Sequence, residues 1–309
     1  MIFVDLKGRI GNQLFIYAFA EALRQKRGGK EMIVFYDYPI VKENWINSLV
    51  DYNLDNVEYR HDVNFPLAVK LKKFLLRLMY HFIRKGDYIK LAEIEKFFQP
   101  LLSKLGIIAC QNGYIQISTP QTKDVYVTGY YQSPAYFKEI DKRLIQLFRL
   151  EKLVDNLNSK DVEHIKTRNS VCISIKVEHN VGNPIYDVCG GDYWEKAIKY
   201  ILERVEDPLF FICSDNVEYV KDNLIDTTKY DTICQDKSLP VHLSLAIMGL
   251  CKHFIIGNTS FGWWAQHMSD NTDKVVVAPK PWVRVNMPIF LYEEKMHFID
   301  TTDYIRYGK

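Results

Sequence analysis

The sequence lacks several features that would place the chain outside the ordinary globular proteins. It has no apolar run long enough to span a bilayer, and its apolar opening, Ile2-Phe-Val-Asp-Leu6, has no basic segment before it and no small-residue cleavage site after it. Its six cysteines include no Cys-x-x-Cys pair, and most lie in apolar stretches such as the one ending at Cys213. We therefore expect a cytoplasmic protein with buried, reduced thiols and without a structural zinc site.

Two binding chemistries also lack their sequence signatures. No Asp-x-Asp occurs in the chain, so a metal ion that bridges a diphosphate is not expected, and no cofactor is predicted. The formal net charge is only +2 and no tract is uninterruptedly basic, which argues against nucleic acid as a partner. Small molecules are the expected partners.

The remaining composition is that of a folded globular chain with room for two lobes. Hydrophobic residues make up 48% and charged residues 25% of the 309 residues, which excludes disordered and fibrous classes. A chain of this length suits two domains, each large enough to bury a core. The polar stretch at 155–160 is the predicted boundary between them.

The chain opens with a pattern of strand, glycine loop and helix. An apolar run from Ile2 to Leu6 breaks at Gly8-Arg-Ile-Gly11-Asn12-Gln13, helical spacing resumes at 14–27, and 31–36 has the pattern of a second strand. This order predicts a βαβ unit in a Rossmann-like lobe. The glycines permit a tight turn at a helix N-terminus, where Asn12 and Gln13 either bind sugar hydroxyls or cap the helix.

A basic amphipathic helix is predicted at about 67–102. Lysines and arginines are interspersed along it. Its apolar residues recur at helical spacing, at Leu67, Leu71, Phe74, Leu75, Leu78 and Phe82. Two interpretations are open. The helix covers the N-terminal lobe with a solvated outer face, or it contacts a membrane surface or a lipid-linked acceptor.

The second half alternates strands with helices, which predicts a second doubly wound sheet. Ligands bind beyond the carboxyl ends of such strands, where three polar breaks fall: after Ile175, at Ser214-Asp215, and at Gly257-Asn258-Thr259-Ser260. The last break precedes a helix, so its hydroxyls either hold a phosphate or cap that helix, with Trp263 and Trp264 as core residues. Asp215 either accepts from a guanine or ribose or caps the next helix.

Four motifs together resemble glycosyltransferase family 11, the α-1,2-fucosyltransferases, in order and spacing over nearly the whole chain. They are Gly8-x-x-Gly11-Asn12-Gln13-Leu14-Phe15, Gly129-Tyr130-Tyr131-Gln132-Ser133, Ser214-Asp215, and Asn258-Thr259-Ser260-Phe261-x-Trp263-Trp264. The resemblance implies a metal-independent α/β enzyme of the GT-B type, with two Rossmann-like lobes facing a central cleft. The implied parts are an acceptor-side lobe at 1–158, a donor lobe at 159–285, and a segment at 286–309 that packs back on the N-terminal lobe.

The resemblance also implies where the substrates bind. We expect the GDP-fucose donor at Gly11, Asn12, Gln13, Ser174, Lys176, Ser214, Asp215, Asn258, Thr259, Ser260 and Phe261. The acceptor, an oligosaccharide or a lipid-linked glycan, is expected at Tyr131, Gln132 and Trp194.

One motif departs from the family. Where the family has His-x-Arg-Arg-Gly-Asp-Tyr, this chain has Ser174-Ile-Lys176-Val-Glu178-His179-Asn180, although the flanking segments still resemble the family. The resemblance implies that the first arginine holds the GDP diphosphate, and Lys176 takes its place. Lysine keeps the positive charge but loses the planar fork that grips two phosphate oxygens, a loss on the order of a few kcal/mol unless His179 or Arg168 compensates.

The expected reaction is an inverting transfer of L-fucose to the 2-hydroxyl of a galactoside. Such a displacement needs a general base near the acceptor hydroxyl, so Lys176, Glu178 and His179 are the catalytic candidates and Asp5 is a weaker base. The alternatives are that Glu178 and His179 are solvated loop residues, that the sugar-nucleotide donor has shifted, or that the chain is a GDP-sugar-binding relic. The absence of an N-terminal anchor favours a bacterial, cytoplasmic enzyme of surface polysaccharide synthesis, at the inner face of the membrane if the basic helix contacts lipid.

Overall fold

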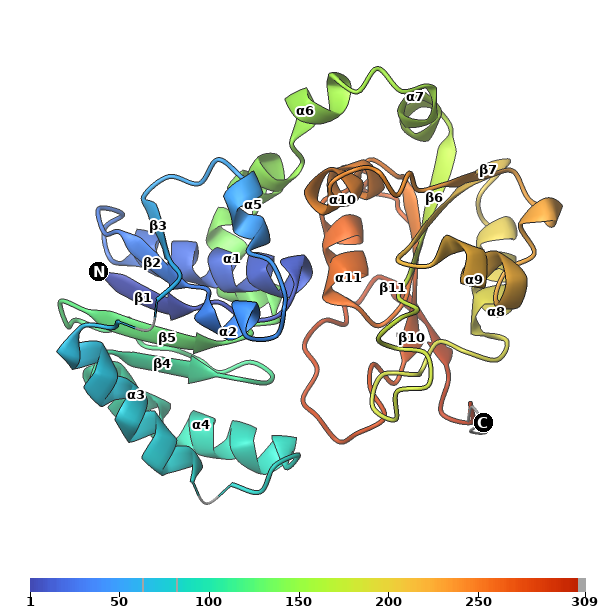
Figure 1. The fold of residues 1–309 in the computed structure, drawn as a ribbon. Helices are drawn as coiled ribbons and strands as arrows, with labels where there is room; N and C mark the ends of the chain where they lie inside the picture. The colour runs from blue at the N-terminus through green and yellow to red at the C-terminus, as the bar shows by residue number, and fades with distance from the viewer. Residues whose placement is uncertain (63, 82, 305–309) are drawn as a thin grey trace. The chain divides into compact units, whose positions relative to one another are not determined.

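Each half of the chain builds its own parallel sheet (Figure 1). The structure is a computed structural model that describes residues 1–62, 64–81 and 83–304. Unit 1 comprises Met1–Leu144 and Asn286–Leu291, and unit 2 comprises Ile145–Val285 and the chain from Tyr292 onward. The first segment of unit 1 thus ends at Leu144, ahead of the predicted boundary at 158. Residues 286–309 were predicted to pack on the N-terminal lobe, and of these Asn286–Leu291 belong to unit 1.

The sheet of unit 1 has five strands in the order β3-β2-β1-β5-β4, and all its paired strands are parallel. The strands are β1 (Ile2–Asp5), β2 (Ile33–Tyr36), β3 (Val57–Arg60), β4 (Ile107–Cys110) and β5 (Val125–Gly129). The helices are α1 (Ile10–Lys26), α2 (Tyr38–Val41), α3 (Leu67–Tyr80) and α4 (Tyr88–Lys104), and α5 (Asp141–Phe148) crosses the unit boundary. The predicted βαβ opening is confirmed, but β3 and β4 were not foreseen.

Helices cover both faces of this sheet because neighbouring residues of each strand point to opposite sides. On one face, the ring of Tyr17 in α1 lies 6.4 Å from that of Phe35 in β2. On the other, Val69 of α3 and Leu102 of α4 join a buried cluster with Phe3 of β1. Figure 1 shows α3 and α4 next to each other on that face.

The single helix predicted at about 67–102 is two helices. Gly86 has φ +90°, a left-handed conformation that favours glycine, and the Asp87 side chain accepts from the backbone N–H of Lys90 at 3.1 Å to begin α4. In α3, Val69 and Leu76 are the buried residues. The apolar residues singled out from the sequence are instead exposed: Leu67, Leu71, Phe74, Leu75 and Leu78. Phe82 lies outside the described residues.

The sheet of unit 2 has six strands in the order β11-β10-β9-β6-β7-β8, again with parallel pairs only. The strands are β6 (Asn169–Ile175), β7 (Pro208–Ser214), β8 (Thr232–Cys234), β9 (His253–Ile256), β10 (Val276–Lys280) and β11 (Met296–Asp300). The helices are α6 (Glu151–Asp155), α7 (Lys160–Thr167), α8 (Tyr193–Leu202), α9 (Val217–Asn223), α10 (Val241–Gly249) and α11 (Ser260–His267). The predicted second doubly wound sheet is confirmed.

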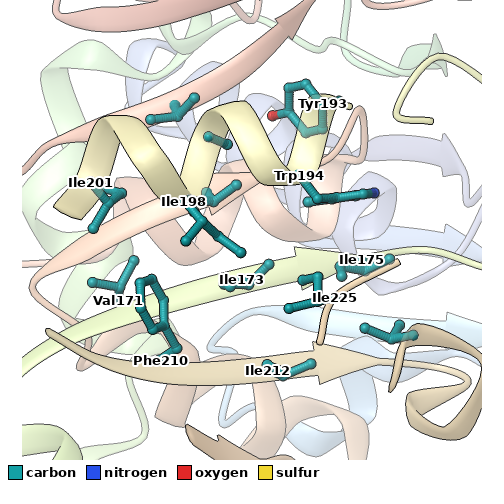
Figure 2. Packing of buried hydrophobic residues seen from close by; sticks show 14 of the residues in the cluster. Val171, Ile173, Ile175, Tyr193, Trp194, Ile198, Ile201, Phe210, Ile212 and Ile225 are labelled. Carbon is teal, nitrogen blue, oxygen red and sulfur yellow. The ribbon is translucent and has the colours of Figure 1, made fainter. Parts of the chain in front are cut away.

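The core of unit 2 lies between β6 and α8. Val171, Ile173 and Ile175 alternate along β6 and point to one face, where Ile198 and Ile201 of α8 cover them (Figure 2). These side chains are buried, and truncating one such isoleucine to alanine costs about 2–5 kcal/mol in comparable cores. This packing fixes the carboxyl end of β6, from which the Lys176 loop begins.

Candidate functional site

Three loops of unit 2 meet at one edge of its sheet. Strands β7 and β8 extend the sheet to one side of β6, and β9, β10 and β11 extend it to the other, so the chain changes direction between β6 and β9. The register aligns Ser174 with Ile256 and Ile175 with Ser214. The segments after β6, β7 and β9 therefore start side by side, at the topological switch point where open α/β sheets bind their ligands.

Lys176 and Asp215 form an ion pair at this edge. The Asp215 carboxylate accepts from the Lys176 ammonium, from the Val177 N–H at 2.8 Å and from the Glu178 N–H at 3.4 Å. Burial alone would raise the pKa of Asp215, but Lys176 and the Val177 N–H outweigh burial and lower that pKa below its usual value. Asp215 thus fixes the loop after β6 together with its lysine.

Asp215 does not cap the helix that follows it. The side chain of Asn216 accepts from the Tyr219 N–H at 3.0 Å and caps α9, while the Ser214 hydroxyl accepts from the Asn216 N–H at 3.1 Å. Of the two interpretations of Asp215, helix capping is therefore wrong. The Lys176 contact was not foreseen, because the pairing of β6 with β7 cannot be read from local spacing.

Asn258 ties two more segments to the strand end. Its amide group donates to the carbonyl oxygens of Tyr186 at 3.0 Å and Trp282 at 2.9 Å, and its oxygen accepts from the Asn180 amide at 3.0 Å. Asn258 is buried, so these bonds replace contacts with water. Asn258 holds the loop after β6 against the loop after β9.

The first residues of α11 follow Asn258. Thr259 caps the helix, since its hydroxyl accepts from the Gly262 N–H at 3.0 Å, and the O–H of Thr259 keeps its donor capacity. Ser260 and Phe261 are half-buried in the first turn, and Trp263 and Trp264 are fully buried core residues. Thr259 therefore caps the helix and the two tryptophans pack in the core, as one of the two interpretations predicted. The positive N-terminal end of α11 still lies at the sheet edge, where it can attract an anion.

Ser174 lies under this helix start. It is buried at the end of β6, and a Cβ added at Gly262 would lie 2.8 Å from its Oγ. The small residues at 174 and 262 therefore let β6 and α11 approach closely. Ser174 stands where the family has histidine, so the close approach belongs to the same departure from the family motif as Lys176.

Glu178 and His179 are exposed on the loop after β6. The His179 ring lies 5.3 Å from the ring of Tyr186. Arg168, the other residue considered as a compensating cation, precedes β6 and pairs with Asp207 and Asp231. It lies before a seven-residue strand that Lys176 follows, about 26 Å away along the strand, and cannot compensate for the missing arginine.

The glycine motif of unit 1 is more enclosed than its sequence indicates. α1 begins at Ile10, so Gly11, Asn12 and Gln13 lie in its first turn. Gln13 is fully buried, and its amide donates to the carbonyl oxygens of Gly8 at 2.9 Å and Ile46 at 2.8 Å. The Asn12 oxygen accepts from the Gln132 amide at 2.7 Å. Gln13 therefore fastens the 46–48 loop to the start of α1.

Two of the three expected acceptor residues are also buried. Tyr131 stacks on Phe19 with ring centroids 3.9 Å apart and donates to backbone carbonyls, including that of Ile108 at 3.1 Å. Trp194 packs in the unit 2 core and donates to the Cys189 carbonyl at 2.9 Å. Both side chains are at most 2% exposed, so packing occupies them, while Gln132 is half-buried.

A basic hollow of about 640 Å³ lies in unit 1. It opens at the switch point of that sheet, between β1 and β5, and its lining includes Lys7, Lys73, Arg77, Gln111 and Tyr126. Lys7 donates to Gln111 at 2.9 Å, and burial lowers the pKa of Lys7. The ammonium of Lys73 lies 2.9 Å from the carboxylate of Asp5. Asp5, the weaker of the general-base candidates, is thus held in an ion pair. Sequence motifs missed this hollow because its residues are scattered over α3, α4 and the link between them, β5, and the segments that follow β1 and β4.

Two properties concern only the part of the chain that the structure describes. Among residues 1–62, 64–81 and 83–304, no cluster of three or more His, Cys, Asp or Glu side chains has the arrangement of a metal site. No described helix is both long and apolar enough to cross a membrane.

Two doubly wound parallel sheets, with loops gathered at a switch point in each, give the protein an α/β fold of the GT-B type. A mutant of Arabidopsis thaliana FUT1 in complex with GDP shares this fold at a TM-score of 0.51 and 10% identity, over 91% of this chain and 71% of that one. The sequence profile of glycosyl transferase family 11 matches residues 95–293, and the chain belongs to this family. The resemblance inferred from the motifs is thus confirmed.

Two Escherichia coli proteins are similar over most of their length. The O-antigen biosynthesis glycosyltransferase WbnK is 23% identical, over 91% of this chain and 94% of its own. An alpha-1,2-colitosyltransferase is 25% identical, over 91% of this chain and 92% of its own.

Proposed function

We propose that the protein transfers L-fucose from GDP-fucose to the 2-hydroxyl of a galactoside, with inversion and without a metal ion. Membership of the fucosyltransferase-type family supports the reaction class. The observation that carries the proposal is the position of Lys176, which follows β6 at the switch point beside β9 and the start of α11. A cation and a helix N-terminus at one sheet edge suit a diphosphate leaving group.

Each group then has a role in the displacement. The acceptor oxygen bonds to C1 of fucose while the bond from C1 to the diphosphate oxygen breaks, and Lys176 with the first N–H groups of α11 stabilises the charge left on GDP. Glu178 or His179, exposed on the same loop, takes the proton of the acceptor hydroxyl. Asp215 positions Lys176 through its ion pair.

The acceptor side is proposed at the hollow of unit 1. Tyr80, Tyr88 and Tyr126 supply aromatic surface there, and Gln111 and Lys7 supply hydrogen-bonding groups. The acceptor is an oligosaccharide or a lipid-linked glycan of a surface polysaccharide, which the name of the O-antigen relative supports. Cytoplasmic action is part of the same proposal.

A shifted donor is the second candidate. One relative is named a colitosyltransferase, and colitose is L-fucose without its 3-hydroxyl. Ser174 and Lys176 both depart from the family motif at the edge where the donor is proposed to bind, which supports a site adapted to such a sugar. Comparing kcat/KM for GDP-fucose with that for its 3-deoxy analogue separates the two donors.

The test measures transfer from GDP-fucose to lactose or N-acetyllactosamine. Lys176→Ala is expected to lower kcat/KM by about 10²–10³, as does the loss of one charge-stabilising donor in other enzymes. Glu178→Gln or His179→Gln lowers kcat if that residue is the base. Lys166→Ala is the matched control. It also removes a lysine from an ion pair, with Asp155, but Lys166 lies in α7 before β6, at the end of the sheet opposite to Lys176.

The outcomes separate the candidates. Transfer that is unchanged in Lys176→Ala removes this lysine from the mechanism. If neither donor is turned over but GDP raises the melting temperature, the chain is a binding relic and the transfer proposal fails.

A further inference from the structure

Helix α3 has two apolar faces, although packing on unit 1 uses only one. Val69 and Leu76 are buried against the sheet. On the opposite face, Leu67, Leu71, Phe74 and Leu78 form a stripe at helical spacing, with exposed fractions of 74%, 57%, 55% and 50%. Such a run of large exposed apolar side chains marks an interaction surface, since single exposed residues would be scattered.

Helix α4 continues this surface. Its outward residues Phe97 and Leu101, one turn apart, are 77% and 54% exposed. Both helices cover the same face of the unit 1 sheet, and Figure 1 shows them adjacent there. We call the outward apolar residues of the two helices, with the cations around them, the α3–α4 face: Leu67, Lys70, Leu71, Phe74, Leu75, Arg77, Leu78, Arg84, Lys85, Phe97 and Leu101.

Positive charge is concentrated on the same segment. Residues 67–104 contain nine lysines and arginines against three acidic residues, a net charge of +6, whereas the whole chain carries only +2. The rest of the molecule is therefore net negative. Lys70 and Arg77 are exposed beside the apolar stripe, and Arg84 and Lys85 are exposed between the two helices.

The charge indicates which partner covers the face. A symmetric dimer in which both copies use this face would bring two strongly positive surfaces together, and a neutral apolar partner would leave the basic rim without counter-charges. An anionic bilayer supplies acyl chains for the apolar stripe and phosphate groups for the rim. Among the described residues no helix crosses a membrane, so the contact is at the surface.

We propose that unit 1 docks on the surface of an anionic lipid bilayer through the α3–α4 face. Phe74 and the leucines beside it enter the boundary between headgroups and acyl chains, and the basic rim pairs with lipid phosphates. The hollow of unit 1 adjoins this face, because Lys73, Arg77 and Arg84 of its lining come from α3 and the link to α4. A bilayer-bound protein would thus hold the hollow close to lipid-linked glycans.

The test measures the binding of the full chain to vesicles by co-sedimentation, without sugar nucleotide. Vesicles of pure phosphatidylcholine are compared with vesicles that contain phosphatidylglycerol, at low and high salt. The expected result is a partition coefficient at least about tenfold higher on the anionic vesicles, falling as salt screens the charges. Equal binding to both vesicle types, or to neither, overturns the proposal.

Two double variants separate the contributions. Leu71→Glu with Phe74→Glu is expected to lower the partition coefficient at least about tenfold, and Lys70→Gln with Arg77→Gln about as much at low salt. The matched control is Leu153→Glu with Leu202→Glu, because these leucines of unit 2 are 46% and 47% exposed outside the α3–α4 face. Binding by both test variants at the wild-type level would contradict the assignment.

Two further readouts distinguish membrane binding from misfolding and from self-association. Circular dichroism melting must show the variants folded, which the exposure of the changed side chains predicts. Sedimentation equilibrium tests self-association: a dimer that Leu71→Glu with Phe74→Glu dissociates, together with no vesicle binding, would assign the face to a second copy and overturn the proposal. Transfer to a soluble acceptor is measured separately, so failure of the proposed reaction leaves the vesicle result interpretable.

Discussion

The ion pair between Lys176 and Asp215 gives a prediction with a defined magnitude. In Asp215→Asn, the amide oxygen still accepts from the Val177 N–H, but the negative charge that holds the Lys176 ammonium is lost. A hydrogen bond to a charged group contributes about 1.5–3 kcal/mol. The two side chains are 22% and 20% exposed, so we take the lower end, about 1.5 kcal/mol, or roughly tenfold in kcat/KM.

A double-mutant cycle tests whether Asp215 acts through the lysine. Once Lys176→Ala has removed the ammonium, Asp215→Asn has nothing left to orient, so the double variant should match Lys176→Ala in kcat/KM. Asp222→Asn, a change at an exposed residue of α9, is the matched control and should have the wild-type rate. Initial-rate measurements with GDP-fucose and N-acetyllactosamine supply all five values.

Additive losses would refute this reasoning. If the double variant falls below Lys176→Ala by the full factor that Asp215→Asn shows alone, Asp215 contacts the substrate independently of the lysine. Urea unfolding of each variant distinguishes a loss of activity from a loss of fold.

Four other predictions concern the packing, charge and chemistry of the same edge of unit 2. Asn258→Ala removes four hydrogen bonds of a buried side chain, one of them a weak bond from the Cys189 thiol, and should lower the free energy of unfolding by about 2–4 kcal/mol in urea titrations. A loss below about 1 kcal/mol, the scale of a single net bond, would show that Asn258 does not hold these segments together. Gly262→Ala places a methyl group against Ser174 and should destabilise by about 1–3 kcal/mol, partly recovered by Ser174→Ala; full stability in the single variant would show that the approach is loose. Because the folded-state pKa of Asp215 is lowered, its contribution is complete above the pKa of an unfolded aspartate, about 3.9, and is lost as pH falls through the lower folded value. The difference in unfolding free energy between wild type and Asp215→Asn should therefore shrink from about pH 5 to about pH 3, and a constant difference would argue against the ion pair. Finally, a chelator should leave the transfer rate unchanged, since the sequence has no Asp-x-Asp; activity lost on chelation and restored by Mg²⁺ or Mn²⁺ would contradict metal independence.

Local patterns predicted the repeating elements of the fold well. Periodicity and turn residues predicted the βαβ opening and the alternating strands and helices of the second half, and the helix expected after Gly257-Asn258-Thr259-Ser260 begins at Ser260. Strand β8 has only three residues, too few for an alternating pattern to stand out, whereas β11 was missed although it is longer than the predicted strand β1. The break between α3 and α4 was signalled by Gly86-Asp87, a glycine followed by a capping residue, but the helical spacing on either side masked it.

Side-chain direction was harder to predict than element type. Gln13 and Asn258 were expected to face the donor, and both instead bond to backbone carbonyls of distant segments. Such ties depend on which loops come together in space, and local sequence does not specify those partners. The outward stripe on α3 shows the same limit, because its leucines and the buried Val69 and Leu76 have equivalent apolar character.

The affinities of GDP and GMP for the wild type and Lys176→Ala test the central claim most directly. If Lys176 holds the diphosphate, calorimetry should show that Lys176→Ala weakens GDP binding at least about tenfold and GMP binding much less, because GMP lacks the second phosphate. Equal weakening of both nucleotides, or none of either, would contradict a diphosphate site at the switch point between β6 and β9.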